Sequence, residues 1–202
     1  MEAVFAQERP EVVDHHAAQM DVRRSMLDPQ FDADVNILGS IKLAQWAIKY
    51  GTRKFIHISS GGAAYGEPVY LPCDENHPVQ PLCPYGASKY TFELYLYLFK
   101  INYGLDYTVI RYPNVYGPRQ DPRGEAGVVA IFTGQMLRGH PVTINGDGEQ
   151  VRDFAGENVA ATHPVGVIGG PLVNTSGPAT EPVRIASRTA NEKGPVSRDF
   201  SA

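Results

Sequence analysis

Tyr85 and Lys89 are the residues of this sequence whose types and spacing best suit chemistry. They lie four positions apart in the segment 84–89, PYGASK, and residues four apart on a helix share one face. A free tyrosine has a pKa of about 10, and a nearby ammonium group lowers it by favouring the phenolate. The pair could therefore act as a general base near neutral pH. Spacing alone also fits a surface lysine beside an amphipathic tyrosine, so the surroundings must decide.

The elements that would position this pair alternate between strands and helices. We expect a helix at 2–9, a strand around 12–13, a helix at 30–50, a strand at 55–58, a helix at 84–102, a strand at 107–112, a helix at 127–138 and a strand at 142–144. Pro10, Gly51 and Gly104 should end the first three helices. This alternation predicts an α/β fold with a parallel sheet flanked by helices, a partial Rossmann-type fold.

The composition predicts a packed core over most of the chain. Of the 202 residues, 43% are hydrophobic and 20% are charged, which is typical of a globular protein. The last fifty residues differ, because Gly, Pro, Thr and Ser dominate 163–182 and 184–202 is polar. We therefore expect one domain at 1–154 and a divergent, irregular, poorly ordered segment at 155–202.

Charge and cysteine usage exclude several classes of partner. The net charge of −4 gives no reason to expect nucleic acid or an anionic membrane as a partner. No apolar run approaches the roughly 20 residues that span a bilayer. The cysteines, Cys73 and Cys83, lack metal-ligand spacing, and we interpret them as free thiols of a reducing cytoplasm.

Five further segments accompany the Tyr-Lys pair in a fixed order. They are HAAQ at 16–19, Ser59-Ser60 at a strand end, Tyr65-Gly66, LDYTVIRYPNVYGP at 105–118 and INGDGEQVRDF at 144–154. Together with PYGASK, this set resembles the NAD-dependent epimerase/dehydratase family of extended short-chain dehydrogenases/reductases. Within that family the UDP-glucose 4-epimerases are the most similar. The resemblance covers about 12 to 154.

The resemblance implies NAD as cofactor and a UDP-sugar as substrate. It implies that the cofactor is bordered by a set of small and polar residues: Ala17, Ala18, Gln19, Asn36, Ser59, Tyr85, Lys89 and Pro113. It further implies that Asn114 and Arg152 contact the phosphates of the nucleotide sugar, which suits a guanidinium. A polar contact to backbone would explain Asn36 equally well. A surface ion pair with Asp153 or Glu149 is the alternative for Arg152.

The family has a catalytic serine or threonine that hydrogen-bonds to the sugar hydroxyl. Counting back from Tyr65-Gly66, this position falls on Gly61, whereas counting back from Tyr85 favours Ser60. Either Ser60 takes the role or Tyr85 works without a hydroxyl partner.

The implied reaction is redox-neutral. Tyr85 would take the proton of the sugar C4 hydroxyl while hydride passes to NAD, and both would then return, the hydride to the other face. Lys89 would hold Tyr85 anionic and bond the nicotinamide ribose. A dehydratase would want an acidic pair at 61–64, where the sequence reads GGAA, so an epimerase is favoured. The family also implies a homodimer.

The Gly-rich turn of a dinucleotide-binding half is absent from this sequence. The match starts near the family's fourth strand, so we expect the isolated chain to bind NAD weakly or not at all. Three possibilities follow: an enzyme that obtains the missing half elsewhere, a truncated product that cannot hold NAD, or a non-catalytic remnant that binds nucleotide sugars or a partner.

Overall fold

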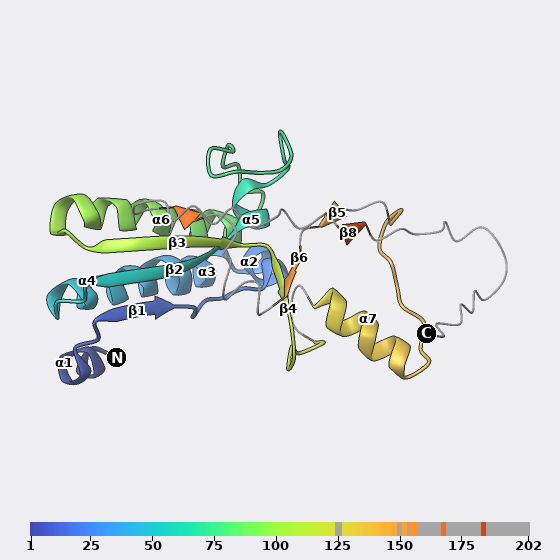
Figure 1. Ribbon diagram of the computed structural model, residues 1–202, viewed down its shortest axis with the longest axis horizontal. Coiled ribbons are helices and arrows are strands. Elements are labelled where there is room, and N and C mark those ends of the chain that lie inside the picture. The colour runs from blue at the N-terminus through green and yellow to red at the C-terminus, as the bar shows by residue number, and fades with distance from the viewer. Residues whose placement is uncertain (124–126, 149–150, 153, 157–166, 169–182, 185–202) are drawn as a thin grey trace.

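The computed structural model describes most of the chain up to residue 156. The described ranges are 1–123, 127–148, 151–152, 154–156, 167–168 and 183–184. At the centre lies a sheet of three parallel strands, β1 (Val12–His15), β2 (Lys54–Ser60) and β3 (Asp106–Tyr112), drawn in Figure 1. The short strand β7 (Val167–Ile168) adds to β3 in the antiparallel direction. The predicted parallel α/β sheet is confirmed, with one antiparallel edge strand that sequence reasoning missed.

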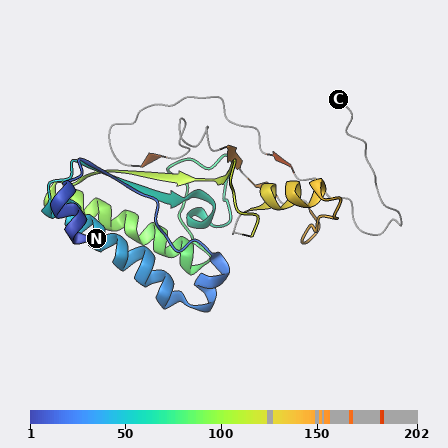
Figure 2. The ribbon, with the colours of Figure 1, turned by 90° about the horizontal axis from the view of Figure 1, so that it is seen from below.

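Two long helical segments cover one face of this sheet. The first comprises α3 (Pro29–Ala33), η1 (Asp34–Gly39) and α4 (Ser40–Lys49), and the second is α6 (Pro84–Tyr103). Figure 2 shows them side by side beneath the strands. Between helices and sheet lies the core cluster: Phe5, Ala44, Ala47, Phe55, Phe92, Leu96, Phe99, Leu105, Tyr107 and Val109. Burial of this apolar surface is the main force that holds the helices to the sheet.

Local signals start and stop both helical segments. The Asp28 carboxylate accepts from the Phe31 N–H at 3.0 Å, and Pro29 occupies the first turn, where it loses no hydrogen bond. The predicted helix at 30–50 is confirmed, but its residues Asp34–Gly39 form a π-helix that the sequence did not predict. Such widened turns are often found at functional sites. Asn36 lies within this one.

Helix α6 begins and ends as its sequence predicts. Cys83 caps it, with Sγ accepting from the Gly86 N–H at 3.4 Å, and Pro84 fills the first position. Gly104 ends it with a φ of 73°, a left-handed conformation that favours glycine. The α1 helix (Glu2–Glu8) before Pro10 and the α7 helix (Val128–Leu137) are also confirmed.

The remaining described elements are short. Helices α2 (Val22–Leu27) and α5 (Gly61–Tyr65) were missed because each is too short to show helical periodicity. Strand β4 (Asn114–Tyr116) pairs in parallel with β6 (Phe154–Gly156), and β5 (Val151–Arg152) pairs with β8 (Val183–Arg184). The expected strand at 142–144 is wrong: these residues pair with no described strand. A strand needs a neighbour to take its backbone hydrogen bonds.

The predicted division at residue 154 is not tested by the described residues. Of the segment 155–202, expected to be irregular, the structure describes only 155–156, β7 and β8, and the rest lies outside the described ranges.

Gly86 sets how closely α6 approaches α5. A Cβ at this buried position would overlap the Ala63 carbonyl oxygen, whereas a Cβ at Gly62 in α5 would meet nothing within 4 Å. We expect Gly86→Ala to lower the free energy of unfolding by about 1–3 kcal/mol, the cost of overpacking. Gly62→Ala is the control and should leave it unchanged or slightly higher. Urea denaturation measures both, and equal stabilities would refute the packing role of Gly86.

Candidate active site at the carboxyl ends of the strands

The predicted site residues gather at one edge of the sheet. Because β1, β2 and β3 are parallel, their carboxyl ends meet there. The turn 16–19 follows β1, Ser59 and Ser60 end β2, and Pro113 and Asn114 follow β3. Tyr85 and Lys89 come from the first turns of α6. In open α/β sheets, ligands bind in the crevice outside these strand ends.

Ser60 and Tyr85 meet at this edge. The Ser60 side chain caps α5 by accepting from the Ala63 N–H at 3.4 Å, and it also forms a hydrogen bond with the Tyr85 side chain. Of the two positions left open by the sequence, Ser60 is therefore the one whose hydroxyl reaches Tyr85, since Gly61 has no side chain. Helix α5, which the sequence did not predict, turns Ser60 toward α6.

The Tyr85 phenol is less acidic than expected. Burial raises its pKa above the usual value, the hydrogen bond with Ser60 lowers it, and the Asp32 carboxylate raises it again. Lys89 is not among the groups that shift this pKa in the chain by itself, so its expected effect on Tyr85 stays a prediction. The pKa is raised because a phenolate loses more solvation on burial than one hydrogen bond returns.

Lys89 is a buried cation. Its residue is 3% exposed, and burial lowers its pKa to about 8, while the carboxylates of Asp32 and Glu93 act in the opposite direction. A buried ammonium is stabilised by hydrogen bonds to acceptors, so this group fits the role of binding a hydroxyl-bearing ligand.

The Asn36 side chain holds the segment 16–19 in place through hydrogen bonds to the backbone of Gln19. Its Oδ1 accepts from the Gln19 N–H at 2.9 Å, and its Nδ2 donates to the Gln19 carbonyl at 2.9 Å. The same Nδ2 lies 3.1 Å from Ser88 Oγ, on α6. The alternative role considered for Asn36, a polar contact to backbone, is therefore present in the structure. Through it, the turn carrying Ala17 and Ala18 is joined to the helix carrying Tyr85.

Asp32 completes this cluster, and the sequence analysis missed it. Its Oδ1 accepts from Gln19 Nε2 at 2.9 Å and from Asn36 Nδ2 at 3.2 Å. Its Oδ2 is buried and has no hydrogen-bond partner among the described residues. The available signal was its position, one helical turn before Asn36. A carboxylate here supplies negative charge near both Lys89 and Tyr85.

Glu93 and Arg111 form a second buried cluster that sequence reasoning did not assign. Arg111 Nη2 lies 2.6 Å from Glu93 Oε2, and Arg111 Nε lies 3.1 Å from Oε1. Ser59 Oγ donates to the same Oε1 at 2.6 Å. Ser59 thus points to Glu93. Its predicted contact with the cofactor is not seen in this arrangement of its hydroxyl and stays a prediction.

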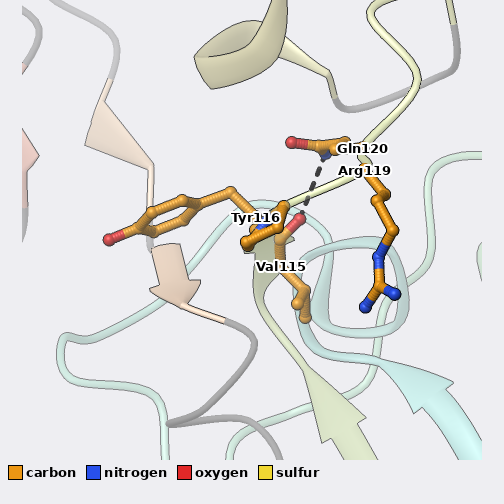
Figure 3. A pocket seen from close by; sticks show the side chains of 6 residues that line it. Val115, Tyr116, Arg119 and Gln120 are labelled. Carbon is orange, nitrogen blue, oxygen red and sulfur yellow. Dashed lines mark hydrogen bonds between the residues drawn. The ribbon is translucent and has the colours of Figure 1, made fainter.

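The segment after β3 forms the outer part of the site. Asn114 lies in β4 and pairs with Phe154 of β6, which brings the Arg-Asp-Phe segment beside it. Arg152 is described through its backbone in β5, so its phosphate contact stays a prediction. A shallow hollow of about 250 Å³ follows Asn114, lined by 115–120. There Gln120 Nε2 donates to the Val115 carbonyl at 3.2 Å, while the Tyr116 and Arg119 side chains point apart (Figure 3).

The described part of the chain lacks two other kinds of site. No cluster of three or more His, Cys, Asp or Glu residues that could hold a metal occurs there. Nor does any described helix have the length and apolar character needed to cross a bilayer.

Known proteins are similar to this chain in sequence and in fold. The model of the NAD dependent epimerase/dehydratase family matches residues 1–156. A UDP-glucose 4-epimerase of Mycolicibacterium smegmatis is 50% identical over 151 residues, which are 75% of this chain and 48% of that protein. The UDP-glucose 4-epimerase of Thermotoga maritima, solved with UDP-glucose, is 54% identical with a TM-score of 0.77, over 80% of this chain and 52% of that one.

A third match carries the cofactor. The UDP-glucose 4-epimerase of Thermus thermophilus, solved as a complex with NAD, is 43% identical with a TM-score of 0.72, over 82% of this chain and 57% of that one. The chain thus spans about half the length of the relatives it matches. Since the family model covers more than three quarters of the sequence, this chain belongs to the NAD-dependent epimerase/dehydratase family.

Proposed function

We propose that this chain carries the catalytic part of an NAD-dependent epimerase that interconverts UDP-glucose and UDP-galactose. One observation carries the proposal: Ser60, Tyr85 and Lys89 converge at the carboxyl ends of the parallel strands, with the Ser60 side chain hydrogen-bonded to the Tyr85 phenol. The identity to UDP-glucose 4-epimerases over this region supports it.

The cofactor would lie against the turn after β1 and the end of β2. Ala17 is exposed and Ala18 partly exposed, so the backbone there is open to a ligand. Lys89 would donate a hydrogen bond from its buried ammonium to a ribose hydroxyl. Gln19, Asn36, Ser59 and Pro113 would line the same side. NAD, when bound, supplies a reversible hydride acceptor.

Tyr85 would exchange the proton of the sugar C4 hydroxyl, and Ser60 would donate a hydrogen bond to the same oxygen. In the chain by itself the raised pKa keeps Tyr85 protonated at neutral pH. Filling the site must therefore lower this pKa before Tyr85 can act as a base. A positive charge brought beside the phenol would have that effect.

Asn114 and Arg152 would hold the phosphates of the nucleotide sugar. A guanidinium binds phosphate oxygens through two parallel hydrogen bonds, which suits Arg152. The stretch 61–64 forms α5 and carries no carboxylate, so no acid lies beside Ser60 to remove water. This favours an epimerase over a dehydratase. A non-catalytic protein that binds nucleotide sugar is the alternative.

We also propose a homodimer formed through the outer face of α6. Four apolar side chains on that face are about half exposed and recur at helical spacing: Leu94 (49%), Tyr97 (55%), Leu98 (47%) and Ile101 (61%). An exposed apolar stripe of this kind is typical of an interface. Symmetric self-association is the commonest way for soluble proteins to cover one. Cytoplasmic location is part of the same proposal, supported by the low cysteine content of the sequence, which suits a reducing compartment.

The reaction can be tested by following UDP-galactose conversion to UDP-glucose with the anomeric proton signals in NMR, at a large excess of NAD because weak NAD binding is expected of this chain. We expect Tyr85→Phe to lower kcat by about 10²–10⁴-fold, the usual contribution of a general acid–base. Tyr103→Phe, at the exposed carboxyl end of α6, is the control and should keep full activity. Unchanged turnover in Tyr85→Phe would reject the assignment. Binding of UDP-glucose without conversion by the wild type would favour the non-catalytic alternative.

The buried charge of Lys89 predicts a pH-dependent stability. Its pKa is about 8 in the folded chain and 10.5 ordinarily, so the folded chain releases this proton first. Stability relative to a Lys89→Gln variant should therefore rise between pH 8 and 10.5, by up to about 3 kcal/mol. Below pH 8 the difference should be constant. Urea denaturation of both proteins across this range measures the effect, and a constant difference throughout would contradict it.

The dimer can be tested by sedimentation equilibrium. Leu98→Glu places a charge in the centre of the exposed stripe and should shift a dimer to monomers. Leu71→Glu is the matched control, because Leu71 is also exposed, at 71%, but lies in the loop before α6. It should leave the mass unchanged. A wild-type monomer at all concentrations would refute the proposal.

A further inference from the structure

Helix α6 carries a buried carboxylate, that of Glu93, on the same face as Tyr85 and Lys89. Glu93 lies four residues after Lys89 and eight after Tyr85, so the three form one stripe along the helix. Glu93 is 6% exposed, and its carboxylate accepts from Arg111 Nε, Arg111 Nη2 and Ser59 Oγ at 3.1, 2.6 and 2.6 Å. It thereby joins α6 to the ends of two strands, β2 through Ser59 and β3 through Arg111.

The Glu93–Arg111 ion pair, here called the anchor, also contacts α5 through Arg111. Its guanidinium carbon lies 4.8 Å from the ring centre of Tyr65 and 5.7 Å from that of Tyr90. Tyr65 is the last residue of α5, the helix that Ser60 caps, and Tyr90 follows Lys89 on α6. Cation–π contacts of this kind hold a guanidinium in one orientation.

Both partners of the Ser60–Tyr85 hydrogen bond are therefore tied to the same anchor. On one side, Ser59 immediately precedes Ser60, and Tyr65 closes the helix that begins at Ser60. On the other side, Glu93 is part of the rigid helix that carries Tyr85. A shift of α6 relative to β2 would stretch the hydrogen bond between Ser59 and Glu93.

Stability alone gives little reason for a charged pair here. Moving two charges out of water costs free energy that their attraction often does not recover, and apolar side chains of similar volume are frequently as stable. What apolar side chains cannot supply is direction, because three hydrogen bonds to one carboxylate allow only one arrangement. The neighbouring catalytic contact needs such accuracy, since small displacements reduce rates strongly.

We propose that Glu93 and Arg111 are positioning residues whose buried ion pair holds the Ser60 hydroxyl against Tyr85. The proposal rests on the function proposed above but concerns the geometry of the chain itself. It can therefore be tested without turnover.

The test measures the pKa of Tyr85 in the isolated chain by NMR of tyrosine labelled at Cζ. The Ser60 hydrogen bond lowers this pKa, so Ser60→Ala should raise it. We expect the double variant Glu93→Leu/Arg111→Met, which keeps the net charge, to raise it by the same amount. Adding Ser60→Ala to that double variant should then change nothing further, because the bond is already lost.

A second ion pair between the same strands provides the control. Lys54 and Asp106 lie 2.9 Å apart at the opposite end of β2 and β3. Lys54→Met/Asp106→Leu should leave the pKa of Tyr85 as in the wild type, and Ser60→Ala should keep its full effect in that background.

An unchanged pKa in the Glu93→Leu/Arg111→Met variant would overturn the proposal, as would full additivity with Ser60→Ala. Should that variant fail to fold, Glu93→Gln/Arg111→Gln also keeps the net charge and replaces the charged hydrogen bonds by weaker neutral ones. It should raise the pKa of Tyr85 by a smaller amount, and no change would again overturn the proposal. If the wild type shows no epimerase activity while these pKa results hold, the proposed reaction is rejected and the positioning role of Glu93 and Arg111 stands.

Discussion

The site depends on how closely α6 lies against α5 and the strand ends. Gly86 permits this approach, because any side chain there would overlap the Ala63 carbonyl. The contact places the first turn of α6 beside the Ser60 cap of α5, and the Ser60–Tyr85 hydrogen bond follows from it. A parallel sheet supplies the other half of the constraint, since it brings the ends of separate strands to one edge.

Four charged side chains are buried near this edge of the sheet, although burying charge costs free energy that an apolar core would not lose. Lys89, Asp32, Glu93 and Arg111 are each 6% exposed or less. Glu93 and Arg111 bond one another, whereas Asp32 Oδ2 and Arg111 Nη1 are buried without a hydrogen-bond partner among the described residues. Proteins commonly accept such local costs where function requires them. The Glu93 carboxylate, which accepts three hydrogen bonds, forms an anchor one helical turn from the buried Lys89.

The raised pKa of Tyr85 links the fold to the proposed reaction. In the relatives, the region matched here is about half of the protein, and one relative is solved with NAD. The described chain holds Ser60 against Tyr85 but does not by itself supply the charge that a phenolate needs. In this interpretation, the chain positions the proton-transfer groups, and the filling of the site activates them. The chain would then set the positions of Ser60 and Tyr85, whereas the bound ligands would lower the pKa of Tyr85.

The sequence by itself determined most of the elements and the candidate pair Tyr85 and Lys89. Periodicity, caps and the glycine stops predicted α6 and the central strands, because these signals are local. The order of the motifs predicted Tyr85 and Lys89 and left Ser60 and Gly61 open. The tertiary structure favours Ser60 as the hydroxyl partner, and this was hidden from the sequence because α5 is too short to leave a periodic pattern and its position depends on the close approach at Gly86. The direction of the Tyr85 pKa shift was likewise a tertiary property, because desolvation depends on what surrounds the ring and not on its neighbours along the helix.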